Sequence, residues 1–480
     1  MNTIYLLTME YISTRGKSKN LQFEDVLLTG LAPDGGLYVP KEWPLLNYNE
    51  LKNTDYHKIA AEILHPFLSS FISYNDLIKL TENAYRSFAT KEMAPLVQLE
   101  ENRYILELFH GPTLAFKDFA MLLLAELFDL SLKKRNEKIT IIGATSGDTG
   151  SAAIEAFKNS QNVNVFIFFP KGRVSEVQRK QMTTTDGSNI FPVEIDGTFD
   201  DCQNIVKDLF KDDIFNNEVK LGAINSINWG RIAAQIVYYF TSFKLLKNDL
   251  VSYSVPTGNF GDILAGWVAK QMGLPIKNLM IATNENDILS RALKTGIYSI
   301  DKAKATISPS MDIQISSNFE RLLFEAYNRN SLSINNLMDN LKNSKEFKIE
   351  KNALNFVRND FLASSITEQE TKECISDVYK KTGYILDPHT AVGYAASRSL
   401  DDKNGVVVTL GTAHPSKFPI AVEDSIKIKP DIPDRLKKVL NKTENFTKME
   451  IDLSLIHISE PTRPERIWCA GVGVEKTKGG

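Results

Sequence analysis

The segment Ile139-Thr140-Ile141-Ile142-Gly143-Ala144-Thr145-Ser146-Gly147-Asp148-Thr149-Gly150 leads from a short apolar run, through a glycine-rich turn, into the helical pattern of residues 151–157. A brief apolar run bounded by turn residues indicates a buried strand. Similar runs recur along the chain and alternate with helical stretches, at residues 104–109, 163–169, 191–195, 221–224, 251–255, 279–283 and 406–410. This alternation predicts an α/β fold of two lobes, each with parallel strands covered on both faces by helices.

Residues 21 to 89 follow a different pattern. Their apolar residues recur mostly at helical spacing, as in Ile59, Ile63, Phe67 and Phe71. The run Pro33-Asp34-Gly35-Gly36 predicts a turn between the first helix and an extended segment. We therefore expect a helical cap before the first lobe.

The composition excludes several classes of protein. The chain has 480 residues, of which 43% are hydrophobic and 24% charged, with a formal net charge of -3. A basic field for nucleic acid or an anionic membrane is missing, and no apolar run is long enough to span a bilayer. The three cysteines have neither disulfide-framework nor metal-ligand spacing. These features predict a cytoplasmic protein with no metal site, no nucleic-acid partner and no membrane partner.

Both ends of the sequence differ from the rest. Residues 1–8 make a poor signal peptide, since they lack a positive start and a small-residue cleavage site, and Met9 is an alternative native start. Near the other end, the run Leu453-Ser454-Leu455-Ile456-His457-Ile458-Ser459-Glu460-Pro461-Thr462-Arg463 looks like a translated sequencing adapter. We expect residues 453–480 to be a non-native tail, the alternative being a genuine peripheral segment.

One lysine stands between apolar and aromatic neighbours, in the run Phe109-His110-Gly111-Pro112-Thr113-Leu114-Ala115-Phe116-Lys117-Asp118-Phe119. Burying an amine as a cation is costly, so such a lysine tends to have a lowered pKa and becomes a nucleophile near neutral pH. It could hold an aldehyde cofactor as a Schiff base. The alternative is a surface lysine whose stem covers apolar residues.

Two glycine-rich loops follow apolar strands and open helices, Gly143–Gly150 and Pro256–Asp262. Glycines let the backbone approach a ligand closely, and the N–H groups at a helix start favour an anion such as phosphate. The spacing is not that of a dinucleotide-binding loop. We expect Asp262 to point away from a bound phosphate. Glycines that serve only the geometry of the turn are the alternative for both loops.

Two further segments combine polar groups at strand ends. The run Leu410-Gly411-Thr412-Ala413-His414-Pro415-Ser416-Lys417-Phe418 brings together hydroxyls, an imidazole and an amine, although a lone histidine such as His414 is more often structural than catalytic. The run Asn225-Ser226-Ile227-Asn228-Trp229-Gly230-Arg231 could grip a phosphate. A helix cap followed by a surface arginine explains this second run equally well.

Taken together, these segments resemble the threonine synthase family of fold-type II pyridoxal-phosphate enzymes, from about Met9 to Phe418. The resemblance also includes the long strings at residues 11–16, 28–38 and 308–321. It implies an N-terminal cap over residues 9–95 and a pyridoxal-phosphate-dependent catalytic region over residues 96–450, built from two intertwined α/β lobes. It further implies conversion of O-phospho-L-homoserine and water to L-threonine and phosphate, by γ-elimination and β-addition of water.

The resemblance also implies roles for individual residues. Lys117 holds the cofactor aldehyde and shuttles protons, Thr412 faces the pyridine nitrogen, and Asp148 lies beside the 3′-oxygen of the cofactor. The cofactor phosphate is bound by Gly258, Asn259, Phe260 and Gly261. The substrate carboxylate is taken by Thr145, Ser146 and Thr149, and the substrate phosphate by Ser226, Asn228 and Arg231.

Two other functions stay open at this point. A lyase of the same fold, such as a serine or threonine dehydratase, would share Lys117 and release a keto acid without hydrating it. The cluster around Arg231 and the long N-terminal cap favour phosphohomoserine instead. A non-catalytic cofactor-binding or scaffold protein is the second alternative, which the intact Lys117 disfavours. The sequence leaves a monomer and a small homo-oligomer equally open.

Overall fold

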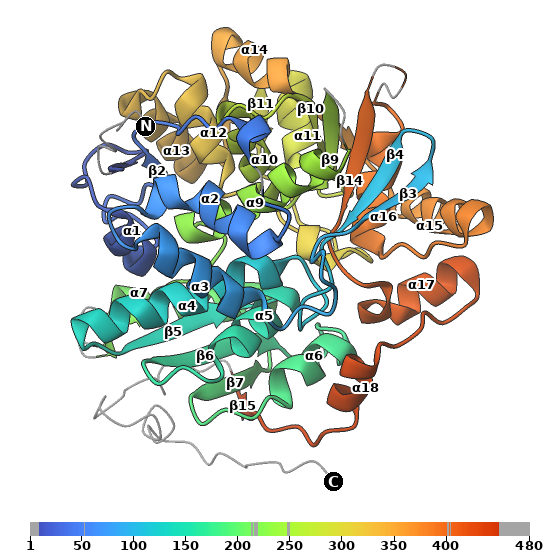
Figure 1. Ribbon diagram of the computed structural model, residues 1–480, viewed down its shortest axis with the longest axis horizontal. Helices are drawn as coiled ribbons and strands as arrows, with labels where there is room; N and C mark the ends of the chain where they lie inside the picture. The colour runs from blue at the N-terminus through green and yellow to red at the C-terminus, as the bar shows by residue number, and fades with distance from the viewer. Residues whose placement is uncertain are drawn as a thin grey trace. The chain divides into compact units, whose positions relative to one another are not determined.

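The computed structural model describes residues 9–51, 53–212, 215, 219–246, 250–400, 403 and 405–450. The chain divides into two compact units (Figure 1). Unit 1 contains the described residues up to Ala120 and Ser226–Pro430, and unit 2 contains Met121–Asn225 and the described residues from Asp431. The segments predicted to be non-native or uncertain, residues 1–8 and 453–480, lie outside the described residues.

Unit 1 is built on a six-stranded sheet in the order β13-β10-β9-β14-β4-β3. Neighbouring strands are parallel, except that β3 runs antiparallel to β4 at the edge. Every residue of the central strands β9 and β14 is buried, as expected for a sheet covered on both faces. The bounds are β3 Leu96–Glu100, β4 Arg103–Glu107, β9 Val251–Pro256, β10 Ile276–Thr283, β13 Phe361–Ser365 and β14 Val406–Gly411.

Helices cover both faces of this sheet. On one face, α16 (Pro388–Ser397) packs against Met280 and Ala282 of β10. On the other, α10 (Gly261–Gln271) approaches so closely that a Cβ on Gly266 would lie 3.0 Å from Leu279. Residues 279 and 280 point to opposite faces because side chains alternate along a strand. The long helix α9 (Trp229–Leu246) packs against α10.

The remaining elements of unit 1 include the N-terminal segment, which is helical as predicted. Its helix α2 packs against α3 and α9, and β1 and β2, which flank α1 in the sequence, pair as a two-stranded antiparallel sheet. The elements before the sheet are β1 Tyr11–Ser13, α1 Phe23–Thr29, β2 Tyr38–Pro40, α2 Tyr56–Leu68 and α3 Tyr74–Tyr85. The later elements are α11 Ile288–Thr295, β11 Ile297–Ser299, the 3-10 turn η2 Pro309–Met311, α12 Phe319–Ala326, α13 Ser331–Ser344, β12 Glu346–Lys348, α14 Lys351–Asp360, α15 Glu368–Thr382, the 3-10 turn η3 Pro415–Lys417 and α17 Pro419–Ile426.

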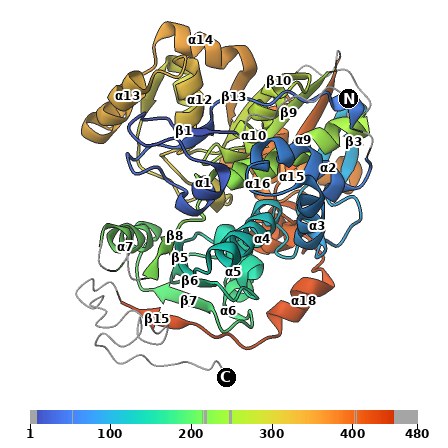
Figure 2. The same cartoon turned by 60° about the vertical axis from the view of Figure 1, so that its left-hand side comes forward.

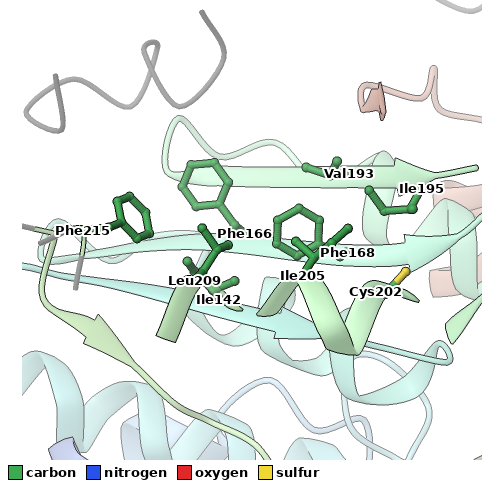
Figure 3. Packing of buried hydrophobic residues seen from close by; sticks show 9 residues of the cluster. All are labelled: Ile142, Phe166, Phe168, Val193, Ile195, Cys202, Ile205, Leu209 and Phe215. Atoms are coloured by element: carbon green, nitrogen blue, oxygen red, sulfur yellow. The ribbon is translucent and has the colours of Figure 1, made fainter. Parts of the chain in front are cut away.

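Unit 2 is built on a five-stranded parallel sheet in the order β15-β7-β6-β5-β8 (Figure 2). Apolar residues of β5, β6 and β7 pack on one face against Cys202, Ile205 and Leu209 of α7 (Figure 3). The strands are β5 Ile139–Ala144, β6 Val163–Pro170, β7 Ile190–Ile195, β8 Leu221–Gly222 and β15 Thr447–Met449. The helices are α4 Lys117–Arg135, which begins in unit 1, α5 Asp148–Phe157, α6 Glu176–Thr183, α7 Phe199–Lys211 and α18 Asp434–Leu440.

All eight predicted strands are present, as β4 to β10 and β14. The strand order has a consequence for function, because β9, β14 and β4 are immediate neighbours and run parallel. The loops that follow their carboxyl ends therefore leave the same edge of the unit 1 sheet. These loops contain Gly258, Thr412 and Lys117.

Candidate active site

Lys117 is the first residue of α4, and the loop before it pairs with the loop that follows β14. The Phe116 N–H donates to the Thr412 carbonyl at 2.9 Å, and the His414 N–H donates to the Leu114 carbonyl at 3.1 Å. Ala115 and Ala413 form an antiparallel bridge. This pairing places Lys117 beside Thr412, two residues that are almost 300 positions apart in the sequence.

The Lys117 side chain is buried, with 8% of its surface exposed, and its Nζ lies 4.7 Å from the centre of the Phe116 ring. The preceding turn is held by Asp118, whose carboxylate accepts hydrogen bonds from the Thr113 N–H at 2.8 Å and the Thr113 hydroxyl at 2.6 Å. The prediction of a buried lysine is confirmed. A rigid turn around a buried amine suits a nucleophile that must keep one orientation.

A buried acid lies near this lysine. The Asp262 carboxylate accepts hydrogen bonds from the Tyr238 hydroxyl and, at 3.3 Å, from the Tyr239 hydroxyl, both on α9. Burial raises the pKa of Asp262 to about 7, and the two tyrosine hydroxyls and the positive charge of Lys117 oppose this rise. The carboxylate points to α9, and the start of α10 has no side-chain cap.

The loop from Gly258 to Gly261 has the backbone geometry of an anion cradle. Its carbonyls are already engaged, since the Ser316 hydroxyl donates to Gly258 O at 2.7 Å and the Asn318 N–H and amide donate to Asn259 O at 3.1 and 3.0 Å. Within the described part of the chain, the N–H groups of residues 258–261 donate to no acceptor. Phe260 adopts a left-handed conformation, with φ 63°. Consecutive unpaired N–H groups at a helix start suit a phosphate.

The hydroxyl of Thr412 is a further feature of this site. Its side chain is 5% exposed, and its Oγ1 is buried without a hydrogen bond to any described residue. An unpaired buried hydroxyl costs free energy unless a ligand pairs with it. A pyridine nitrogen would supply that partner. The orphan hydroxyl, the N–H cradle and the buried lysine all follow the carboxyl ends of neighbouring strands of one sheet, and together they fit pyridoxal phosphate.

The turn before α9 is held by side chains that the sequence analysis did not single out. Asn318 donates through its amide to the Ser226 carbonyl at 3.0 Å as well as to Asn259 O, so one side chain joins this turn to the loop Gly258–Gly261. Arg321 donates to the Ile227 carbonyl at 2.6 Å. Both residues lie in the segment 308–321, which the sequence analysis identified only as part of the family resemblance, with no role for any single residue.

Of the predicted substrate-phosphate residues, Ser226 and Asn228 lie in this turn and Arg231 lies in the first turn of α9. Ser226 is half-buried, whereas Asn228 and Arg231 are buried. The Asn228 amide donates to the Leu27 carbonyl at 2.8 Å, and its oxygen accepts from the Gly230 N–H at 3.0 Å, so it also caps α9. Burial lowers the pKa of Arg231 to about 10, which leaves the guanidinium charged at neutral pH.

The other glycine-rich loop belongs to unit 2. The Thr145 hydroxyl accepts from the N–H groups of Gly147 and Gly150, at 3.0 and 2.9 Å, and so fixes the turn between β5 and α5. Gly147 has φ 136°, and a Cβ there would collide with Gln178. Gln178, which the sequence analysis missed, donates to the Asp148 carboxylate at 2.8 Å. Ser146 and Thr149 are half-buried.

Other polar clusters give no sign of a second chemistry. The His414 Nδ1 lies 2.7 Å from the Ser416 hydroxyl, and burial lowers the pKa of His414 to about 4, so the ring is neutral at neutral pH. Across the described ranges, His, Cys, Asp and Glu side chains form no group of three that could hold a metal ion. In the same ranges, no helix has both the length and the apolarity to cross a membrane.

Three family models match the sequence. One described as "Threonine synthase N terminus" matches residues 10–85, one described as "Pyridoxal-phosphate dependent enzyme" matches residues 92–411, and one described as "Threonine synthase, C-terminal" matches residues 390–458. The third match ends inside the segment predicted to be a non-native tail. Together the three span nearly all of the described residues.

Individual relatives agree with these matches. The threonine synthase of Pseudomonas aeruginosa is 48% identical over 455 residues, which are 93% of this chain and 97% of the relative. That of Saccharomyces cerevisiae is 43% identical and covers 89% of this chain and 93% of its own length. The crystal structure of PLP-bound threonine synthase from Brucella melitensis superimposes with a TM-score of 0.91 at 48% identity, over 93% of this chain and 98% of that structure.

Proposed function

This chain belongs to the threonine synthase family and is a pyridoxal-phosphate enzyme that converts O-phospho-L-homoserine and water to L-threonine and phosphate, and we propose that Lys117 carries its cofactor and moves its protons. The reaction is the last step of threonine biosynthesis. The observation that carries the assignment of Lys117 is that its buried side chain follows a loop whose main chain pairs with that of Thr412, the residue with the orphan hydroxyl. When bound, pyridoxal phosphate supplies an aldehyde for the substrate amine and an electron sink for charge that develops on the substrate.

Each part of the cradle has a separate task in this proposal. The N–H groups of residues 258–261 hold the phosphate of the cofactor, and the Thr412 hydroxyl pairs with its ring nitrogen. A neutral hydroxyl at that nitrogen leaves the ring less electron-withdrawing than a carboxylate would. Asp148 stands beside the 3′-oxygen, in the orientation that Gln178 gives it.

Lys117 performs the proton transfers. The Nζ of Lys117 would remove the proton from the α carbon of the substrate. A proton is then lost from the β carbon and phosphate leaves the γ carbon. The γ carbon gains a proton, the hydroxyl of water adds at the β carbon, and a proton returns to the α carbon. The burial of Lys117 keeps bulk water away from the amine.

The substrate is held at its two anionic ends. Arg231 and Ser226 bind the phosphate, while Asn228, whose amide already caps α9, keeps their turn in place. Thr145, Ser146 and Thr149 bind the carboxylate. A desolvated guanidinium such as that of Arg231 is stabilised by a phosphate, which replaces the hydration that it lost on burial.

A product assay tests the reaction as a whole. Holoenzyme given O-phospho-L-homoserine should release phosphate and threonine in equal amounts. Phosphate accompanied by a keto acid, with no threonine, would indicate a lyase of the same fold. No turnover despite bound cofactor would contradict the substrate.

A labelling experiment tests the assignment of Lys117. Reduction of the holoenzyme with borohydride should fix the cofactor to one lysine, and we expect peptide mass spectrometry to find it on Lys117. Lys417 is the internal control, because it is also fully buried and its Nζ donates to the Thr113 carbonyl of the same turn at 2.8 Å. The cofactor on Lys417, or on no lysine, would contradict the proposal. Lys117→Ala should abolish the labelling and the turnover.

We also propose that the enzyme works in the cytoplasm, as a monomer or a small homo-oligomer. Cys202 and Cys374 are free and buried, which suits a reducing compartment. Sedimentation of the purified holoenzyme would give its oligomeric state.

A further inference from the structure

A cluster of polar side chains at the start of α16 has no part in the function described so far. Asp387, His389 and Thr390 are all buried, with 1 to 3% of their surfaces exposed. The Asp387 Oδ1 accepts from the His389 N–H and lies 2.9 Å from His389 Nδ1, while its Oδ2 accepts from the Thr390 N–H at 3.2 Å and from the Thr390 hydroxyl. This is more than a helix cap requires, because two side chains are fixed as well as two N–H groups.

The first of these side chains reaches the loop after β14. Thr390 has one hydroxyl proton, and Asp387 receives it. The lone pairs of the same oxygen are therefore turned to other donors, and the Thr412 N–H donates to it at 3.1 Å. Asp387 thus sets, through Thr390, the main-chain position of the residue whose Oγ1 awaits the ring nitrogen.

The second side chain reaches the turn behind the phosphate cradle. The Ser310 N–H donates to His389 Nε2 at 3.2 Å, so Nε2 is unprotonated and Nδ1 carries the proton that points to Asp387. Ser310 lies in η2, against the cradle, since a Cβ on Gly258 would come within 2.9 Å of the Ser310 carbonyl oxygen. His389 thereby fixes the wall against which Gly258 rests.

We propose that Asp387 is a positioning residue of the cofactor site, which holds Thr412 through Thr390 and the turn behind Gly258 through His389. This inference rests on the proposed function, because Thr412 and Gly258 are the residues assigned there to the ring nitrogen and the phosphate of the cofactor. The buried carboxylate of Asp387 thereby holds two supports of the cofactor in place. Thr412 supports the ring nitrogen, and the turn behind Gly258 supports the phosphate. The α16 helix is also tied to β9, where the Ser254 hydroxyl donates to Gly393 O at 2.6 Å.

The variant Thr390→Val tests the proposal. It keeps the shape of the side chain and leaves the Thr412 N–H without its acceptor, so we expect pyridoxal phosphate to bind about tenfold more weakly and the absorbance maximum of the bound cofactor to shift. Thr390→Ser keeps the hydroxyl and should restore both. The matched control is Thr371→Val on α15, a buried threonine whose hydroxyl donates only to Thr367 O, at 2.8 Å, and which should leave affinity and spectrum unchanged.

The opposite result would be clear. A folded Thr390→Val protein with wild-type cofactor affinity and spectrum overturns the inference and leaves the proposed function intact. A wild-type protein that binds no pyridoxal phosphate overturns the proposed function, and the inference with it.

A second pair of variants decides the matter if Thr390→Val does not fold. His389→Gln keeps an acceptor near Ser310, whereas His389→Leu removes it. We expect Gln to retain affinity within about twofold and Leu to lose about tenfold. Equal affinities in the two variants would overturn the inference.

Discussion

Lys117 and Asp262 are buried residues of the candidate active site whose charges interact. Each is an ionisable group whose side chain is buried. For Asp262 the result is a pKa near neutrality, because the two tyrosine hydroxyls and the lysine only partly offset its burial. A carboxyl that ionises near pH 7 should leave its mark on the stability of the protein.

Asp262 makes the stability of the cofactor-free protein depend on pH. Burial raises its pKa from an ordinary 3.8 to about 7, so between these values the folded protein binds a proton that the unfolded chain does not. Stability therefore falls as the pH rises from about 4 to about 7, and then stays level. The side chain of Asp262→Asn cannot ionise. The free energy of unfolding of this variant, relative to that of the wild type, should therefore rise by about 3 kcal/mol between pH 5 and pH 8.

Urea unfolding at the two pH values measures this difference. The control is Asp208→Asn, at an exposed position on α7, which should show almost no such gain. If the Asp262→Asn difference does not change with pH, the carboxyl of Asp262 titrates normally in the folded protein.

Arg231 should matter for the substrate and not for the cofactor. Arg231→Ala removes a buried charge from the proposed phosphate site, and we expect kcat/KM for O-phospho-L-homoserine to fall about 100-fold, the loss expected for charge-assisted hydrogen bonds. Cofactor absorbance should not change. Arg231→Lys keeps the charge without the planar guanidinium, so its kcat/KM should lie between that of the wild type and that of Arg231→Ala. Unchanged kinetics in Arg231→Ala would reject the phosphate site.

At the scale of elements, α12 joins parts of unit 1 that are remote in sequence. The Arg321 guanidinium on this helix donates to the carbonyls of Tyr38, in β2, and Ile227, in the turn before α9, and also to the Asn318 side chain. It lies 5.7 Å from the Trp229 ring. Burial lowers its pKa to about 9, so it remains a cation surrounded by neutral acceptors.

Removing Arg321 should therefore destabilise unit 1. Arg321→Leu leaves three buried acceptors without a donor, and we expect a loss of about 3 kcal/mol or more in the free energy of unfolding. The control is Arg291→Leu, on α11, where a half-exposed ion pair with Asp287 should cost about 1 kcal/mol or less. Equal losses in urea titrations of the two variants would mean that Arg321 contributes no more than a surface arginine.

At the scale of the whole molecule, the chain enters and leaves unit 2 through α4 and the turn at residues 225–226, and it returns to unit 2 after Pro430. The final return ends in β15, which pairs with β7 at the edge of the sheet. The Phe446 ring, just before that strand, lies 6.1 Å from the ring of Phe169. The last described strand is thus an integral part of unit 2.

Truncation tests whether residues beyond this strand matter. Chains that end at residue 452 or at residue 458 both retain β15, and we expect both to keep kcat within about twofold of the full chain, since the pairing with β7 is preserved. A chain that ends at residue 445 loses β15 and should be less stable in urea. Loss of activity on removal of residues 453–480 would show that the segment is native.

The sequence was sufficient for local structure. Runs such as Ile139–Ala144 are apolar enough to be buried on both faces, and this property appears in any window of the chain. The edge strand β3 and the strand β13 escaped notice, because several of their residues are exposed and polar and so break the apolar pattern. Lys117, Thr412 and Gly258 stood out for the same local reason, as polar or flexible residues directly after buried strands.

By itself, the sequence determined the two α/β lobes, the buried lysine and the family. Only the tertiary structure decided that β14 lies between β9 and β4, which joins the Thr412 loop to the loop of Lys117. It also decided that the Asn228 amide caps a helix and that Thr390 and His389 accept hydrogen bonds from the N–H groups of Thr412 and Ser310. The physical reason is that periodicity and propensity act between near neighbours, whereas strand order and buried hydrogen bonds join residues that only folding brings together.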